Sequence, residues 1–441
     1  MVRKKLLIAV AGFSFMCLLG GCGSTRNEAL SSVQSQTLPS IQEEDRENET
    51  EKIETSTQIS QEQVQEEEKM GMKTSEFGYE LLGFHVEDKN PVLSPVSAYL
   101  ALSMAGFGAD GATKNEFDHV LGEDMVEHAH NMMNTFPSKS DVLCLSIANS
   151  AWIDDSFTVN DAWMEAIQAR MNAEAYQSDL STAETMAHIN NWIDEKTNGM
   201  IDQMLTEPLD VQTQLALFNT VYFKGKWQIP FKASDTHKEN FYLQSGQEDA
   251  EQVEMMNLYA TEVDYIANDF AEGVILPYQN DGNQNIAFIA LKPTDNTNVR
   301  DIYGRLTGRD IQDMIVNKQT TLVDMKLPKF EITFDKNLTE CLKNMGLTQC
   351  FDMEKANFDQ IGKAESGENL YIGLVRQKAK IIVDEEGTEA AAVTAVLMMC
   401  AGALEPEETK ELYFNEPFIY MIMDMDNDMP LFIGILDNPA V

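Results

Sequence analysis

The chain has 441 residues and a formal net charge of −40 at pH 7, because 72 acidic side chains outnumber 32 basic ones. Proteins bind nucleic acids through Lys and Arg side chains that displace counterions from the phosphates, so this charge argues against a nucleic-acid partner. The basic residues form no cluster that would bind a heparin-like polyanion.

Residues 1–21 have the pattern of a signal peptide. A basic start precedes an apolar run over residues 6–19 that is too short to span a bilayer as a helix. The run leads into Leu19-Gly-Gly-Cys22, which resembles the lipobox of bacterial lipoproteins, where the peptide is removed before a cysteine that then carries lipid. The resemblance implies an exported protein anchored in the cell envelope through Cys22. An ordinary signal peptide with an incidental cysteine is the alternative.

A polar segment follows the signal peptide. Residues 22–72 contain no aromatic residue and are rich in Ser, Thr, Gln and Glu, so they cannot bury enough apolar surface to fold. The sequence predicts a disordered acidic tether, which would hold the folded part outside the cell. Residues 73–441 contain no internal linker or repeat, and we expect one large domain there.

The elements of this domain change in kind along the chain. Helix patterns come early, and Ser97 is the expected N-cap of the second helix. Strand patterns dominate later, without βαβ alternation, so we expect an α+β domain with large mixed or antiparallel sheets. Helices are predicted over residues 76–83, 98–106, 162–175, 188–205 and 338–346, and strands over 142–153, 214–224, 273–277, 286–291, 320–332, 370–383, 418–424 and 431–436.

The sequence contains no catalytic motif. HExxH, GxSxG and a Gly-rich phosphate loop are all missing from it. His128 and His130 are two residues apart, so on a helix they point to opposite sides and cannot share a metal ion. We therefore expect no enzyme, no cofactor and no metal. The remaining cysteines have no paired spacing, which favours free thiols at Cys144, Cys341, Cys350 and Cys400.

The segment from Asp384 to Ala403 is the most unusual part of the chain. It starts charged, passes one glycine and then runs through small residues into an apolar tip. Local propensity alone favours a helix over residues 388–399, because Ala, Leu and Met are good helix formers. The alternative is a segment that exists in two environments, which would make it the working part of the protein.

Several blocks, in order over residues 73–441, together resemble the serpin family. They include Asn90-Pro-Val-Leu-Ser-Pro-Val-Ser97, Leu217-Phe-Asn-Thr-Val-Tyr-Phe-Lys-Gly-Lys-Trp227 and Phe414-Asn-Glu-Pro-Phe418. The resemblance implies the serpin fold, with three β-sheets, eight or nine helices and an exposed reactive centre loop at about residues 385–413. It also implies a monomeric serine protease inhibitor, not an enzyme, whose partner is a target protease held in a covalent complex.

The resemblance identifies the segment 384–403 with the reactive loop. In the family mechanism a protease cleaves this loop and forms an acyl-enzyme, and the freed part enters a sheet as a new strand. Side chains alternate across a strand, so Thr388, Ala390, Ala392 and Thr394 would face one way. The hinge pattern of inhibitory members matches Glu385, Gly387, Thr388, Glu389, Ala390, Ala391 and Ala392.

The family spacing places the cleaved bond at Ala401–Gly402, with Met399–Cys400 and Cys400–Ala401 as alternatives. A small or unbranched apolar residue precedes each bond, which favours elastase-like proteases, followed by chymotrypsin- or subtilisin-like ones. No Lys or Arg lies between Lys380 and Lys410, which excludes trypsin-like proteases. Cys400 also allows a redox-sensitive loop as a minor alternative.

The resemblance further implies a polar cluster beneath the strands that open. Ser94, Ser97 and Asn219 match this cluster, and Gln377 stands where the family has a histidine. Trp227 matches the family tryptophan at the point where the loop first enters the sheet. Two other functions remain open. One is a non-inhibitory serpin that acts as a surface binding lipoprotein. The other is a lipoprotein that binds solutes for a transporter, although the sequence does not show the two α/β lobes expected of that class.

Overall fold

The computed structural model describes residues 73–440 except for residues 137, 244–248, 281, 283, 296, 365 and 389–408. The predicted signal peptide, the predicted lipidation site Cys22 and the predicted tether therefore lie outside the described residues. Within the described ranges, no helix is long and apolar enough to cross a membrane.

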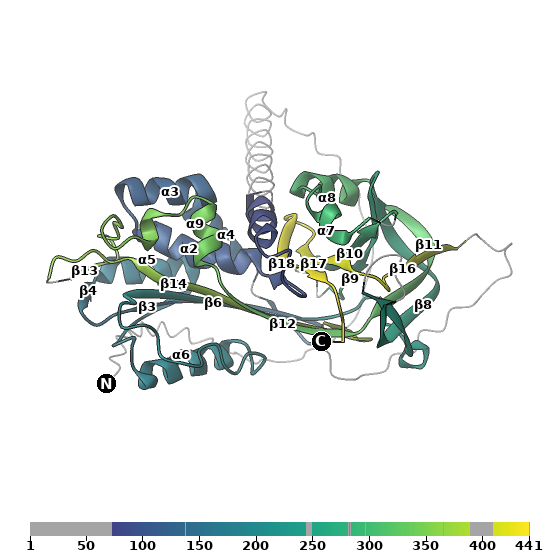
Figure 1. Cartoon of the computed structure of the whole chain (residues 1–441), viewed down its shortest axis with the longest axis horizontal. Helices are drawn as coiled ribbons and strands as arrows, with labels where there is room; N and C mark the ends of the chain where they lie inside the picture. Colours follow the sequence, from purple (N-terminus) through teal and green to yellow (C-terminus); the bar gives the residue numbers. More distant parts are fainter. Residues whose placement is uncertain are drawn as a thin grey trace, which may run out of the picture. The chain divides into compact units, whose positions relative to one another are not determined.

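The helices cover both faces of a central sheet. Figure 1 shows α6 on one face of this sheet, with α2 and its neighbours α3, α4 and α5 on the other. The described chain begins in a helix over residues 73–83. The helices after it are α2 (Pro95–Gly108), α3 (Gly111–Leu121), α4 (Met125–Thr135), α5 (Asp161–Met171), α6 (Ala183–Lys196), α7 (Val299–Tyr303), α8 (Gly308–Val316) and α9 (Thr339–Asn344), together with the 3₁₀ turns η1 (Ala233–Asp235) and η2 (Gln349–Phe351).

The central sheet has seven strands in the order β12-β14-β15-β6-β3-β2, with β5 paired to β3. The strand β15 contributes only two residues, and it lies between β14 and β6. This sheet is therefore the one that a new strand would extend. Its members are β2 (Ser138–Lys139), β3 (Leu143–Ile153), β5 (Ala173–Gln177), β6 (Leu215–Lys226), β12 (Phe330–Asn337), β14 (Ile372–Val383) and β15 (Gly387–Thr388).

A second sheet has nine strands in the order β1-β18-β17-β10-β9-β8-β11-β16, with β7 paired to β8. A third pairs β4 (Phe157–Val159) with β13 (Gly362–Ala364), so the described residues form the three sheets that the resemblance predicts. The nine strands are β1 (Val92–Leu93), β7 (His237–Tyr242), β8 (Ala250–Ala267), β9 (Ala271–Pro277), β10 (Ile286–Pro293), β11 (Gln319–Pro328), β16 (Lys410–Tyr413), β17 (Phe418–Asp424) and β18 (Met429–Leu436).

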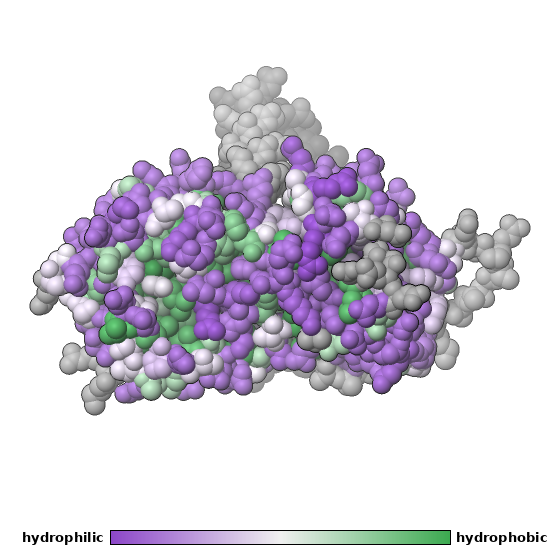
Figure 2. All heavy atoms as spheres, in the orientation of Figure 1, coloured by the Kyte–Doolittle hydropathy of each residue, from purple (hydrophilic) through white to green (hydrophobic). Residues whose placement is uncertain are grey.

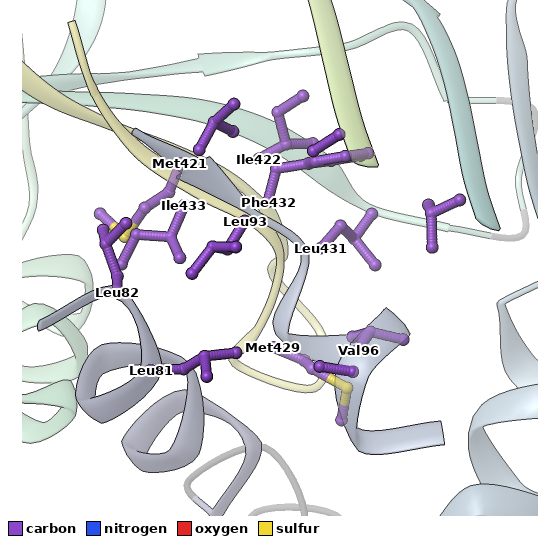
Figure 3. Close-up of a cluster of buried hydrophobic side chains, with 14 of the residues drawn as sticks. Leu81, Leu82, Leu93, Val96, Met421, Ile422, Met429, Leu431, Phe432 and Ile433 are labelled. Atoms are coloured by element: carbon purple, nitrogen blue, oxygen red, sulfur yellow. The ribbon is translucent and has the colours of Figure 1, made fainter. Parts of the chain in front are cut away.

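Part of the main hydrophobic core lies where β17 and β18 meet the first helices. All seven residues of β17 and all eight of β18 are buried. Figure 3 shows side chains of both strands in one cluster with Leu81, Leu82, Leu93 and Val96, which come from the first helix, β1 and the start of α2. Hydrophilic residues cover most of the face drawn in Figure 2, in keeping with the large net charge.

Several helix boundaries differ from the predicted ones. α2 begins at Pro95 and is capped by Ser94, whose hydroxyl accepts from the backbone N–H of Ser97. The prediction of Ser97 as N-cap was therefore wrong, because proline at the first helical position moves the start toward the N-terminus. The helix predicted over 162–175 ends at Met171, since Asn172 adopts the left-handed conformation and β5 follows. α6 ends at Lys196, short of the predicted residue 205.

The strand predictions hold in position but not in number. The pattern over 320–332 covers two strands, β11 and β12, which Lys329 separates. The strand β8 was missed, because a backbone irregularity at Ala260, with φ of 44°, interrupts its alternation of apolar and polar residues. In the described part of the chain, Cys144, Cys341 and Cys350 take part in no disulfide, as predicted, whereas Cys400 lies outside it.

Candidate functional site: the gap between β6 and β14

The central sheet has a gap between β6 and β14. In the described part of the chain the two strands pair in parallel only at one end, from Ile372 to Arg376 of β14 and from Leu215 to Phe218 of β6. At the other end β15 lies between them, with Gly387 opposite Lys226. The strand pairings described across this gap include neither residues 219–224 of β6 nor residues 377–382 of β14. The site is thus an incomplete sheet with its first two residues in place.

Gly387 fits its position only as glycine. Its φ is 156°, and a Cβ atom there would lie 1.9 Å from the carbonyl oxygen of Gly225. Any side chain would therefore push the segment away from β6. Thr388 follows with only 2% of its surface exposed, so the start of the loop is already buried in the sheet.

Trp227 and Tyr278 hold this first turn of the loop. The indole N–H of Trp227 donates to the carbonyl of Asp384 at 2.8 Å, and its backbone N–H donates to Glu386 at 2.8 Å. The ring of Tyr278 stacks on that of Trp227 with centroids 4.6 Å apart. The Tyr278 hydroxyl shares a 2.5 Å hydrogen bond with the hydroxyl of Thr388. The family resemblance implied that Trp227 lies where the loop first enters the sheet. The structure places it directly against the hinge residues Asp384 and Glu386.

Two carboxyl groups at the hinge have opposite pKa shifts. Burial opposes the ionisation of Glu385, but the Nζ of Lys329, 2.6 Å away, outweighs it and lowers the pKa of that carboxyl. Burial raises the pKa of Asp384, although its carboxylate accepts from the backbone N–H groups of Glu386 and Gly387. The ion pair therefore fixes the hinge to the strand junction before β12, and the Asp384 carboxylate closes its turn.

The predicted polar cluster does come together beneath the gap. Gln377 is 4% exposed and bonds twice to the backbone of Ser94, whose N–H donates to Oε1 while its carbonyl accepts from Nε2, each at 2.9 Å. An amide can make both bonds at once because it carries a donor and an acceptor. Gln377 thus connects β14 to the start of α2.

The second half of the cluster lies on β6. The hydroxyl of Ser97 donates to Oδ1 of Asn219, and the Asn219 amide donates to Oδ1 of Asn149 on β3. The Asn149 amide donates in turn to the carbonyl of Met171 at 3.2 Å. All these side chains are buried, so each depends on its neighbour for a partner.

Sequence reasoning missed two residues of this site. Asn149 stands in the middle of a strand that is mostly apolar, which was a usable signal because a buried amide needs partners. Tyr278 follows the strand pattern of residues 273–277 and carried no signal of its own. Glu389, Ala390, Ala391 and Ala392, and the candidate bond residues Met399, Cys400, Ala401 and Gly402, lie outside the described residues.

The described residues contain no group of three or more His, Cys, Asp or Glu side chains that could hold a metal ion. The arrangement allows a conformational change in which a strand is added between β6 and β14. Backbone N–H and C=O groups along both strands would gain partners by this addition.

Comparison with known proteins supports this description. The family profile described as serpin (serine protease inhibitor) matches residues 72–439. Serpin-Z2B of Triticum aestivum is 30% identical over 366 residues, which cover 80% of this chain and 90% of that protein. Alpha-1-antichymotrypsin of Homo sapiens is 29% identical over 374 residues, which cover 82% of this chain and 85% of that protein.

A solved structure shows the same arrangement of elements. The thermophilic serpin Tengpin, in its native state, matches with a TM-score of 0.76 and 34% sequence identity, over 84% of this chain and 94% of that chain. The predicted serpin fold is therefore confirmed. The chain belongs to the serpin family, whose members are protease inhibitors rather than enzymes.

Proposed function

We propose that the chain inhibits elastase-like serine proteases by suicide inhibition. The protease attacks the loop at Ala401–Gly402, forms an acyl-enzyme and is carried along when the freed loop enters the gap between β6 and β14. About fourteen residues at ~3.3 Å each move the attached protease about 45 Å. The single observation that carries this proposal is the position of β15, which starts a strand in the gap.

The register of β15 supports the insertion. Thr388 lies opposite Gly225 of β6 and Val383 of β14. When this antiparallel register is continued, Thr394 meets Asn219 on one side and Gln377 on the other. The next residue would meet Phe218 and Arg376, which pair with each other. Residues 389–394 would thus fill the gap without breaking a strand pair, and the residues after them would enter by separating the β6–β14 pairs from Phe218 and Arg376 onward.

The alternation of side chains suits the same register. Ala390 would lie between Phe223 and Ile381, both of which are in the core with at most 2% exposed. Only a small side chain fits there without displacing the packed rings and branched chains around it. Glu389 would face the other side of the sheet, opposite Lys224, where its charge meets an opposite one.

The tip of the loop would set the specificity. Ala401 precedes the proposed bond, and the small primary pocket of elastase-like proteases accepts such a side chain. The side chain of Ala401 is not basic, so trypsin-like proteases would not form the complex with the natural loop. We expect Ala401→Arg to transfer inhibition from elastase to trypsin. If this change has no effect, the cleaved bond is Met399–Cys400 or Cys400–Ala401.

A denaturing gel tests the mechanism. The protein is mixed with pancreatic elastase, and an adduct that resists SDS, with a released peptide beginning at Gly402, is the expected result. Cleavage without an adduct would refute inhibition and favour the non-inhibitory binding lipoprotein. Two matched variants locate the insertion: Ala390→Glu would bury a charge in the core and give cleavage alone, whereas Ala391→Glu would lie on the other face of the sheet, where its carboxylate can pair with Lys380, and keep the adduct.

We also propose that the protein is exported and anchored in the cell envelope through lipid on Cys22, with the serpin domain facing outside. The lipobox-like residues before Cys22 support this location. Metabolic labelling with a palmitate analogue tests it. Label is expected on the natural protein and not on Cys22→Ala, and an unlabelled natural protein would refute the anchor.

A further inference from the structure

A cavity of about 240 Å³ lies next to the hinge, at the point where β8 and β9 separate. The two strands pair only as far as Asp264 and Ile275. Beyond that point β8 continues along β11, whereas β9 runs on to Pro277 beside β10. The residues that follow β6 close the remaining side. The apolar walls are formed by Trp227, Leu258, Val263, Ile275, Leu276 and Pro277.

The mouth of the cavity carries negative charge. Glu262 and Asp264 line it, together with Thr320. Lys318 neutralises Asp264 with its Nζ 2.7 Å from the carboxylate. Glu262 has no ion pair within the described ranges of the chain, and its side chain is exposed. An apolar floor beneath one uncompensated carboxylate is complementary to an apolar ligand with one positive charge.

An exposed apolar side chain extends the floor outward. Ile229 lines the cavity, and 48% of its surface is exposed, which is unusual for a large apolar residue of this chain. Ligand pockets combine such apolar surface with a few polar groups that fix the orientation of the ligand. The volume is below the range of about 300–1,000 Å³ that drug-sized ligands need, so it suits a molecule with one ring.

We infer that this cavity binds a small apolar cation, namely a primary amine with one aromatic ring. The ring lies against Pro277 and Ile229, and the ammonium group lies beside Glu262. The class of ligand follows from the shape and charge of the cavity alone.

The lining of this cavity is connected to the hinge through Trp227 and through Pro277, the neighbour of Tyr278. Trp227 is one of the lining residues, and it donates hydrogen bonds to the carbonyls of Asp384 and Glu386. Pro277 directly precedes Tyr278, whose hydroxyl binds Thr388. A bound amine therefore stabilises the described position of residues 384–388. The consequence for protease inhibition rests on the proposed function, whereas the binding does not.

Calorimetry on the intact protein tests the binding, with 2-phenylethylamine as the probe. We expect the neutral analogue 2-phenylethanol to bind about five- to tenfold more weakly, because it lacks the charge that Glu262 attracts. Glu262→Gln should weaken amine binding by the same factor. Thr320→Trp should abolish it by filling the mouth, and Glu251→Gln, an exposed change on the same strand, should leave it unchanged.

The control decides between a site and diffuse attraction. If Glu251→Gln weakens binding as much as Glu262→Gln, the amine follows the net charge of the chain and the site is refuted. Hydrogen–deuterium exchange then tests the connection to the hinge. Saturating amine should slow deuterium uptake of residues 384–388, and unchanged uptake in the bound protein would overturn that connection. No protease takes part, so failure of the proposed inhibition leaves both results interpretable.

Discussion

The hydrogen bond between Tyr278 and Thr388 gives the sharpest test of how the hinge is held. Tyr278→Phe removes one hydroxyl, Thr388→Val removes the other, and the double variant removes both. Each change keeps the shape of the side chain. Burial raises the pKa of Tyr278, so its hydroxyl stays protonated at neutral pH and can take part in the bond.

The magnitude follows from burial. Thr388 is 2% exposed and Tyr278 is 3% exposed, so a hydroxyl that loses its partner cannot find water. Leaving one buried polar group without a partner costs about 1–3 kcal/mol, whereas removing both groups can be nearly neutral. Since about 1.4 kcal/mol is a factor of ten, each single variant should open the hinge about 5- to 140-fold more often. The double variant should open it no more than either single one.

Hydrogen–deuterium exchange of residues 384–388 measures this opening. The expected result is faster uptake in both single variants, without a further increase in the double variant. Tyr259→Phe, at an exposed tyrosine on β8, serves as the control and should leave uptake unchanged. If the two single effects multiply in the double variant, the hydroxyls act independently, and the geometry described here does not hold the hinge.

Three further predictions concern other contacts. The pKa of Glu385 is lowered in the folded protein, so its ion pair with Lys329 protects the hinge above the ordinary pKa of a carboxyl group and is lost as pH falls through the folded value. In Lys329→Gln the protection of the hinge should no longer depend on acid pH. Hydrogen–deuterium exchange of residues 384–388, corrected for the pH dependence of intrinsic exchange rates, measures this protection. Asn219→Ala leaves Asn149 without its donor and should lower the free energy of unfolding by about 2–4 kcal/mol, measured by urea denaturation. Glu174→Gln weakens the contact of β5 with α6 by about 0.5–1 kcal/mol and should speed exchange of that helix.

Each of these changes has a matched control. Lys363→Gln breaks an exposed pair with Asp359 and should not alter the pH profile of the hinge. Ser181→Ala, at the surface, should leave the urea midpoint within about 0.5 kcal/mol of the natural protein. Equal effects of Asn219→Ala and Ser181→Ala would contradict the buried chain of hydrogen bonds. If the amides of α6 exchange no faster in Glu174→Gln than in the natural protein, apolar packing alone holds α6 against the sheet.

The order of the strands along the chain was predictable, but their partners were not. Continuous apolar runs such as residues 418–424 predicted their strands correctly, because a fully buried strand has no polar side to obscure the pattern. Which strands lie side by side depends on contacts between residues far apart in sequence, and a single sequence records none of them. The family resemblance supplied that information.

The site was predictable to a similar degree. Ser94, Ser97, Asn219 and Gln377 were identified through the resemblance, and the structure brings them together in two connected groups. The bond between Thr388 and Tyr278 could not be foreseen, because it joins residues 110 positions apart and depends on how far the loop enters the sheet. Local propensity favoured a helix from residue 388 onward, whereas tertiary contacts make Thr388 a strand residue.

The order of the nine-stranded sheet has a consequence for when the chain can fold. β1 pairs with β18, and β17 lies between β18 and β10, so the last two strands to be synthesised occupy the interior of that sheet. A nascent chain that lacks residues 418–436 has no partner for β1 and leaves one edge of β10 open. The sheet can close only after synthesis of the whole domain. Under the proposed export, the polypeptide would reach the far side of the membrane with its fold still incomplete, and chaperones that bind unpaired strand edges would have their substrate there.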